Sequence, residues 1–435
     1  MLTYGILKQI QKSTLYFINN LKYTKNFSQL NKYKNGINQS FKAYLIIRNK
    51  STLIIGNAIK DISYNRRIDD PKIRKLLGVW LATCSGMVFF TIVIGGLTRL
   101  TESGLSMVSW HMFKEFPPIT NEQWVTEFEN YKLYPEFKIK NVDITLNEFK
   151  RIWYMEWIHR MSGRTIGLTF LIPALYFASK GWIMKYPSLR RRLIAYTLLL
   201  GFQGLLGWYM VKSGLSSKNH SPNPDGDHFN DDVPRVSQYR LAAHLGTAFV
   251  LYSLMLWATL GYLMPDSLKK VNMNLQPLKN IRRMAHATKS LIFITAISGA
   301  FVAGLDAGLI YNSFPKMGDY WIPSDIFTLS PRWKNFFENP AMVQMDHRIL
   351  ATITLSSVVA TWFITKRVPK HMLTPRIKLA CNCMVGMTTI QIMLGISTLL
   401  YHVPISLASL HQGGSLFLLS NAIWLTHELR KIPKL

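Results

Sequence analysis

The sequence predicts an all-α integral membrane protein, with eight transmembrane helices forming two four-helix bundles that are parallel repeats of each other. Eight apolar stretches approach or exceed the roughly 20 residues needed to cross a bilayer core. Basic charge alternates between successive connections of the 435-residue chain, and four histidines recur at matching places in its two halves. A composition of 49% hydrophobic residues would also suit a large soluble protein, so the lengths of the apolar stretches decide the class.

The predicted membrane spans are, in order, 76–98, 155–177, 193–211, 241–263, 290–310, 342–365, 379–400 and 406–426. We expect an N-terminal bundle within 61–265 and a C-terminal bundle within 266–435. Because each bundle has an even number of helices, both start and end on the same side of the membrane, so the repeat is parallel. Sites in such bundles are built from side chains on facing helices.

The net charge of +28 follows this topology. The connections 180–192, 264–290 and 366–378 each carry +5, whereas 99–155 and 212–239 each carry −1. The positive-inside rule therefore places both termini and the basic connections on one side, which is the matrix if the membrane is mitochondrial. The charge is explained by topology, and no nucleic-acid partner is expected.

The first 60 residues hold ten Lys or Arg and no Asp or Glu. A basic, acid-free leader is typical of a mitochondrial transit peptide, and we expect 1–60 to comprise a targeting leader and a matrix segment. The three cysteines, Cys84, Cys381 and Cys383, all fall in predicted spans. Their placement excludes a disulfide framework and argues against a thiolate metal site.

Matching positions in the two halves are related by three offsets. The matched pairs are His159 with His347 and Gln203 with Gln391 at an offset of 188, His244 with His411 at 167, and Glu102 with Asp306 at 204. The last offset, between the first helices of the two halves, has the weakest sequence support. The offset of 188 holds across the second and third spans of each half, and the fourth and first spans need the other two offsets.

The histidine pairs predict two haem sites. Ionisable side chains at membrane depth are costly, so two matched pairs indicate a function. A haem held between two helices needs an imidazole from each helix, and His159 with His244, and His347 with His411, meet this requirement near the outer ends of their spans. For any single histidine, an interfacial polar residue would be the simpler interpretation. The duplicated register favours haem iron as the common ligand.

The two predicted sites differ by one carboxylate. Glu156 lies one turn before His159, whereas Gln344 holds that place in the second half. The difference suggests that proton chemistry occurs only at the first site, with Glu156 as the catalytic residue. The alternative is a helix-start residue paired with Arg160.

Four arginines near the histidines are candidate partners for haem propionates, since guanidinium matches carboxylate in a bidentate fork. They are Arg160, Arg164, Arg240 and Arg348. Taken singly, each could equally be an interfacial anchor whose aliphatic stem lies along apolar surface.

At these residues the chain resembles the haem A synthase family, the mitochondrial branch in particular. The segments that carry the resemblance are Gly95–Ser106, Glu156–Arg160, Arg240–His244, Ala303–Leu309, Asp346–Arg348 and Leu410–Gln412. They occur in both halves and in order. The segment that leaves the first span makes the match specific.

The resemblance implies an inner-membrane oxidoreductase that converts the C8 methyl group of haem O to a formyl group, making haem A for cytochrome c oxidase. It implies that His347 and His411 hold a resident haem b, and that His159 and His244 flank the substrate haem beside Glu156. The implied partners are mitochondrial ferredoxin with its reductase as electron source, haem O synthase, cytochrome c oxidase assembly factors and membrane lipid. The oligomeric state stays open, a homo-oligomer included.

The oxygen source also stays open at this point. An iron with two imidazole ligands has no position for oxygen, so either one ligand leaves or water attacks an oxidised methyl, with Glu156 as base.

Two rival functions fit part of the pattern. A bis-histidine cytochrome b that only transfers electrons explains the histidines but not the difference between Glu156 and Gln344. A transporter explains the repeat, but its site should lie near the midplane between the repeats.

Overall fold

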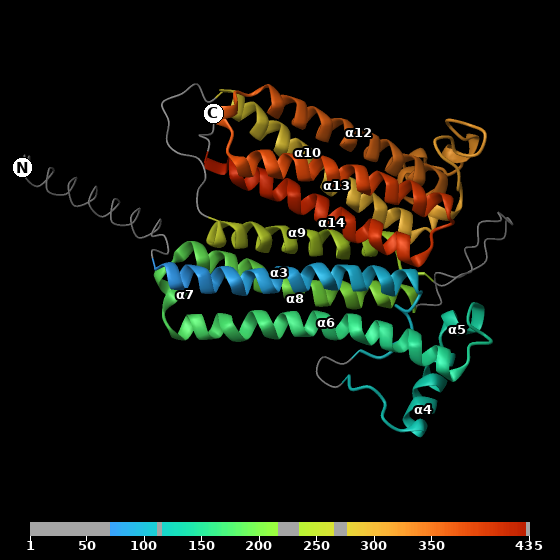
Figure 1. Ribbon diagram of the computed structural model, residues 1–435. Helices are drawn as coiled ribbons and strands as arrows, with labels where there is room; N and C mark the ends of the chain where they lie inside the picture. The colour runs from blue at the N-terminus through green and yellow to red at the C-terminus, as the bar shows by residue number, and fades with distance from the viewer. Residues whose placement is uncertain (1–69, 111–114, 216–234, 265–275, 432–435) are drawn as a thin grey trace, which may run out of the picture. The chain divides into compact units, whose positions relative to one another are not determined.

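The computed structural model describes residues 70–110, 115–215, 235–264 and 276–431, so the predicted leader at 1–60 lies outside the described residues. Apart from residues 185–188, the helices discussed below belong to one unit, made of 68–184 and 189–435. Figure 1 shows the long helices of this unit running alongside one another. Within the described residues the fold is all-α, with one isolated β-bridge between Met317 and Tyr320.

Eight long helices occupy the regions of the predicted spans. They are α3 (Pro71–Leu100), α6 (Leu146–Ser179), α8 (Pro187–Gly214), α9 (Gln238–Leu263), α10 (Gln276–Gly304), α12 (Pro340–Arg367), α13 (Pro375–Leu400) and α14 (Ile405–Glu428). Four short helices lie between them: α4 (Asn121–Lys132), α5 (Pro135–Ile139), α7 (Trp182–Lys185) and α11 (Asn335–Glu338).

Six of the long helices, α3, α8, α9, α10, α12 and α13, are long and apolar enough to cross a membrane. Helices α6 and α14 are long enough but more polar. Helix α6 carries Glu156, Arg160 and Arg164, and α14 carries His411, Gln412 and Ser415, all of which line an internal cavity. Six of the eight predicted spans therefore have the length and composition of a membrane helix. The other two, α6 and α14, are helices that carry predicted site residues.

Local signals in the sequence fix where the helices start. Asp70 accepts hydrogen bonds from the first turn of α3, and Pro71 follows it. Thr145 and Glu148 form a capping box at the start of α6. This start is nine residues before the predicted span at 155–177, so about two and a half turns of α6 precede that span. His159 therefore lies well inside its helix.

Packing contacts recur between the halves. Cys84 on α3 contacts the Thr169 carbonyl of α6 at 4.0 Å, and Thr288 on α10 donates to the Ser357 carbonyl of α12 at 3.3 Å. The donors are related by the offset of 204 and the acceptors by 188. Helices α3, α9, α10 and α14 form the seam between the halves. One link there is the amide of Gln412, which donates to the Ile92 carbonyl at 3.1 Å.

The last two helices of each half pack differently. Helix α13 packs closely along α14, whereas α8 does not approach α9 to the same extent. The first half is also the one that carries α4 and α5 after α3. These short helices pack on the start of α6 through a cluster of aromatic and apolar side chains, whose buried members are Met107, Trp124, Tyr131, Phe149 and Trp153.

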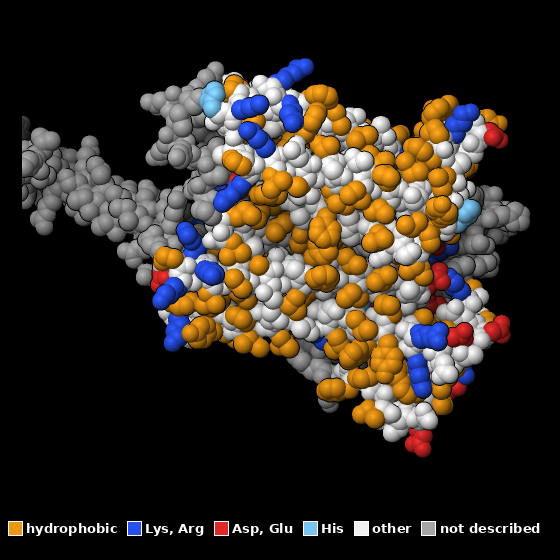
Figure 2. Space-filling model, in the orientation of Figure 1, with side chains coloured by type: hydrophobic (Ala, Val, Ile, Leu, Met, Phe, Trp, Pro, Cys, Tyr) orange, Lys and Arg blue, Asp and Glu red, His pale blue; other side chains and the backbone are white. Residues whose placement is uncertain are grey.

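Side chains on the surface are sorted by type along the helices. In the face drawn in Figure 2, apolar side chains cover the middle, lysines and arginines gather at the end where α7 lies, and acidic side chains appear mainly at the opposite end. This distribution is what a multi-pass membrane protein requires, since charged groups avoid the hydrocarbon core.

Candidate functional site

All four predicted histidines line one internal cavity of about 1900 Å³, together with Glu156 and Gln344. They come from four different helices: α6, α9, α12 and α14. The structure therefore brings together the residues that the sequence pairs. Most of the remaining lining is apolar or glycine, but charged side chains such as Arg99, Asp306 and Arg348 line it as well.

Each histidine ring lies against a glycine of a neighbouring helix. A Cβ added to Gly95, Gly207, Gly299 or Gly395 would lie 2.7, 3.3, 3.3 and 2.8 Å from Cε1 of His159, His244, His347 and His411, respectively. Gly95 and Gly299 are related by the offset of 204, and Gly207 and Gly395 by 188. The absence of a side chain at these positions lets the rings sit close to the adjacent backbone, and at Gly95 and Gly395 any larger residue would move the ring.

The two histidines of the second half lie at a separation compatible with two ligands on one metal. The ring centroids of His347 and His411 are 6.4 Å apart, and the rings are inclined by 83°. Two imidazole nitrogens each bonded to one metal ion at about 2 Å would place the ring centres roughly 6 Å apart. These residues therefore fit the two imidazoles that a haem iron would need, as far as their separation is concerned.

Both histidines of this pair are held through Nδ1. Ser298 Oγ lies 2.7 Å from Nδ1 of His347. Nδ1 of His411 lies 3.1 Å from the Gln391 carbonyl, and the amide of Gln391 also donates to the His411 carbonyl. Such partners fix the orientation of a histidine ligand and leave Nε2 for the metal.

The first-half pair lacks a serine or glutamine partner at Nδ1, and neither Nδ1 makes a well-formed hydrogen bond. The backbone of Thr91 interacts with His159 as the backbone of the matched Thr295 does with His347, so this interaction is common to both halves. Gln203, the counterpart of Gln391, donates to the His244 carbonyl and to the Thr247 hydroxyl. Both halves thus have two histidines and a nearby glutamine. Only in the second half does Nδ1 of each histidine have a well-formed hydrogen bond.

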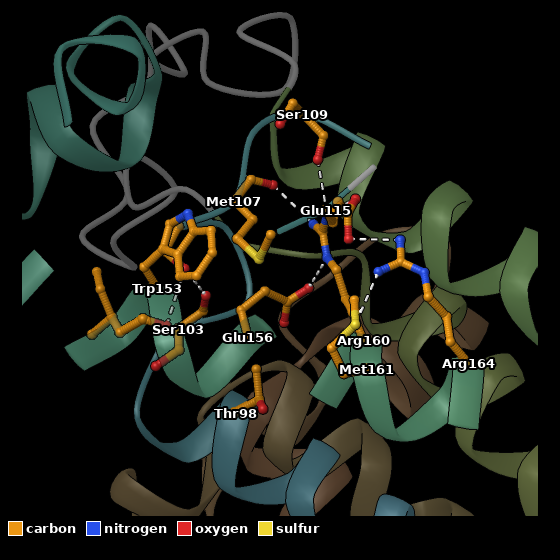
Figure 3. Close-up of polar contacts among 12 residues, drawn as sticks. Thr98, Ser103, Met107, Ser109, Glu115, Trp153, Glu156, Arg160, Met161 and Arg164 are labelled. Atoms are coloured by element: carbon orange, nitrogen blue, oxygen red, sulfur yellow. Dashed lines mark hydrogen bonds and ion pairs between the residues drawn. The ribbon is translucent and has the colours of Figure 1, made fainter. Parts of the chain in front are cut away.

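Glu156 belongs to a buried ionic network at the outer end of α6 (Figure 3). It is 3% exposed and accepts from Arg160 Nε at 2.6 Å. Arg160 also contacts Glu115 at 3.2 Å, and Glu115 contacts Arg164 at 2.6 Å. Two further donations, to the carbonyls of Met107 and Ser109, tie Arg160 to the segment after α3. The network holds the Glu156 carboxylate at the cavity wall.

In the second half the residue matched to Glu156 is the neutral Gln344. Gln344 accepts from Arg348 at 3.0 Å and donates to the Ala307 carbonyl at 2.7 Å. Arg348 donates to the carbonyls of Tyr311 and Ser313, in the segment after α10. Each half therefore uses an arginine to anchor its outer segment, but only the first half places a carboxylate there.

The four arginines predicted as propionate partners all contact protein groups. Arg160, Arg164 and Arg348 make the contacts described above. Arg240 lies 3.6 Å above the ring of Tyr209 and donates to its carbonyl at 2.7 Å. Sequence reasoning missed Glu115, which joins two of these arginines. Nothing in the sequence near Glu115 distinguishes it from a solvated loop residue.

Matched lining positions differ in size in both directions. Gly163, Gly167 and Gly204 line the cavity in the first half, where Ala351, Leu355 and Ile392 stand 188 residues on. Conversely, Ile92, Ile166 and Leu200 are matched by Ala296, Thr354 and Thr388. The lining therefore differs between the halves in shape, with neither half uniformly the smaller.

The chain matches the family described as "Cytochrome oxidase assembly protein" over residues 78–423. It is 54% identical over 361 residues to heme A synthase COX15 of Bos taurus, with 83% of each chain covered. To the Homo sapiens protein of the same name it is 53% identical over 362 residues, covering 83% of this chain and 84% of that one. It is also 42% identical over 380 residues to a Schizosaccharomyces pombe heme A synthase-mitochondrial ferredoxin fusion protein, covering 82% of this chain and 60% of that one. The chain belongs to the haem A synthase family.

Proposed function

We propose that this protein is a haem A synthase, an oxidoreductase that converts the C8 methyl group of haem O to the formyl group of haem A. The observation that carries the proposal is the unequal pair of histidine sites in one cavity. Both have two imidazoles, but only the first has a carboxylate, Glu156, one turn before its first histidine, where the second has Gln344. Family membership gives the reaction class. The difference between the two sites supports our assignment of the substrate haem to the first half and the resident haem to the second.

His347 and His411 would hold a resident haem b, because their separation suits one iron and both rings are oriented through Nδ1. When bound, the haem supplies the redox chemistry. The protein contributes ligand orientation and an apolar surrounding, which tune that chemistry.

His159 and His244 would receive the substrate haem. The assignment is supported by Glu156, which lies one turn before His159 and has the neutral Gln344 as its counterpart in the second half. Glu156, which accepts from Arg160, would accept a proton from the substrate methyl group or from an attacking water.

The membrane arrangement is part of the proposal. All eight long helices would cross the mitochondrial inner membrane as two parallel four-helix repeats, with both termini in the matrix. The recurring contacts at the three offsets support the repeat, and the basic connections support the orientation. Reducing electrons would come from a matrix ferredoxin and its reductase, a partner suggested by the fused ferredoxin of the Schizosaccharomyces pombe relative. Haem O synthase would supply the substrate.

The test is conversion by the purified protein. Detergent-solubilised protein supplied with haem O and a reduced ferredoxin system should form haem A, detected by chromatography and mass spectrometry. Labelled oxygen gas compared with labelled water then identifies the source of the formyl oxygen. A protein that holds haem and reduces carriers but never forms haem A would instead be a membrane cytochrome b.

A further inference from the structure

The halves differ in the residue beside the first histidine of each pair. Ser298 Oγ donates to the Thr295 carbonyl at 2.8 Å, so its oxygen accepts from Nδ1 of His347. This chain of hydrogen bonds selects the tautomer whose Nε2 carries a free lone pair for iron. At the matched position of the first half, 204 residues earlier, stands Ile94, which cannot accept a hydrogen bond.

The halves also differ in a residue near the second histidine of each pair. A Cβ added to Gly414 would lie 2.3 Å from Gln391 Oε1, so any side chain there would displace the amide of Gln391. The backbone carbonyl of the same Gln391 lies 3.1 Å from Nδ1 of His411. The matched residue of α9, 167 positions earlier, is Thr247, whose hydroxyl instead accepts from Gln203 at 2.7 Å. Helix α8 correspondingly stands further from α9.

We propose that Ser298 and Gly414 are positioning residues that make the second pair a permanently ligated site, whereas Ile94 and Thr247 leave the first pair able to release its iron ligand. The inference rests on the proposed function, since it concerns which haem stays and which is exchanged. A carbonyl or hydroxyl on Nδ1 restrains the ring and raises its basicity, which strengthens the bond at Nε2. A substrate site must instead bind one haem and release another in every cycle, so a rigid ligand pair there would slow turnover.

The first test removes the restraint in the second half. Haem transfer from the purified protein to excess apomyoglobin is followed by absorbance. S298A should release its resident haem about tenfold faster than the unmodified protein, within the range typical for loss of such partners. S298T, which keeps a hydroxyl, should restore most of the retention. S290A is the matched control, because Ser290 lies on the same helix and bonds only its own helix, at the His286 carbonyl.

The second test adds the restraint to the first half. The double variant I94S/T247G is loaded with haem O without reductant, and haem O release to apomyoglobin is measured. Release should slow severalfold, while release of the resident haem stays unchanged. The variant G386A, on α13 where an added Cβ meets nothing within 4 Å, controls for a glycine exchange in this class of helix.

The outcomes separate the two proposals. Unmodified protein that purifies without haem and binds none overturns the proposed function. Protein that holds haem normally, but in which S298A releases it no faster and I94S/T247G releases haem O no slower, overturns only the positioning role. Because S298T is expected to fold like the unmodified protein, retention in S298T together with loss in S298A separates the hydrogen bond from misfolding.

Discussion

The two halves of the molecule contain matched pairs of histidines, yet the surroundings of the two pairs differ. In the second half a hydroxyl and a carbonyl lie at Nδ1 of the two histidines, and Arg348 is paired with the neutral Gln344. In the first half neither Nδ1 has a well-formed hydrogen bond, and Arg160 holds Glu156. We infer from this comparison that a few neighbouring residues give two similar histidine pairs different tasks.

The largest expected effect is that removal of a histidine abolishes the haem site of its own half and spares the other. H347A should purify without the resident haem, because one imidazole cannot hold the iron as two do. H159A should keep the resident haem and lose haem A formation. Pyridine-haemochrome quantification and the turnover assay measure both. Loss of the resident haem in H159A with retention in H347A would reverse our assignment of the halves.

Replacement of Glu156 tests the chemical difference between the halves. E156Q should reduce haem A formation by about 10² to 10⁴-fold, the usual contribution of a general base, with resident haem content unchanged. The variant should fold, because Gln344 already accepts from Arg348 at the matched place. E148Q on the same helix is the control, since glutamine also completes a capping box. Equal turnover in E156Q and E148Q would leave Glu156 a structural partner of Arg160.

The glycine contacts should give smaller, graded effects. In G395A the new Cβ lies 2.8 Å from the His411 ring, whereas in G299A it lies 3.3 Å from that of His347. Overpacking of this kind costs about 1–3 kcal/mol, and the closer contact should cost more. Thermal unfolding followed at the haem absorbance band should therefore show a larger drop for G395A. Equal midpoints for G395A, G299A and the control G386A would mean that the rings move aside freely.

The smallest effect concerns the outer segment that only the first half carries with α4 and α5. Burial raises the pKa of Glu136 from 4.5 to about 7, although the Tyr131 hydroxyl donates to its carboxyl group. Because the folded pKa lies above the unfolded one, stability of this segment should fall as pH rises from about 4.5 to about 7 and then level off.

Hydrogen-exchange protection of residues 121–141, corrected for intrinsic exchange rates, measures this dependence. E136Q should remove it and give equal protection at pH 5 and pH 8. E129Q, at an exposed glutamate of α4, should keep it. The same pH dependence in E136Q would assign the effect to another group.

Much of the arrangement could be predicted from the sequence. Long apolar runs locate six of the helices that can cross a membrane, and the duplicated histidines are the residues that meet in the cavity. The prediction was less exact for α6, which begins at Leu146 because a capping box there outweighs the polarity of its first turns. The short helices α4 and α5 were not predicted, since their cluster forms only when Trp124 and Phe149, distant in sequence, pack together.

The sequence by itself indicated the four histidines, their pairing and the difference between Glu156 and Gln344, because identity and spacing along a helix are local properties. Only the tertiary structure showed that Glu115 joins Arg160 to Arg164, that a glycine lies against each histidine ring, and that Ser298 reaches His347. These contacts join segments far apart in the chain, and their distances depend on how closely the helices pack. The proposed difference between the two pairs therefore depends on the places where helices meet.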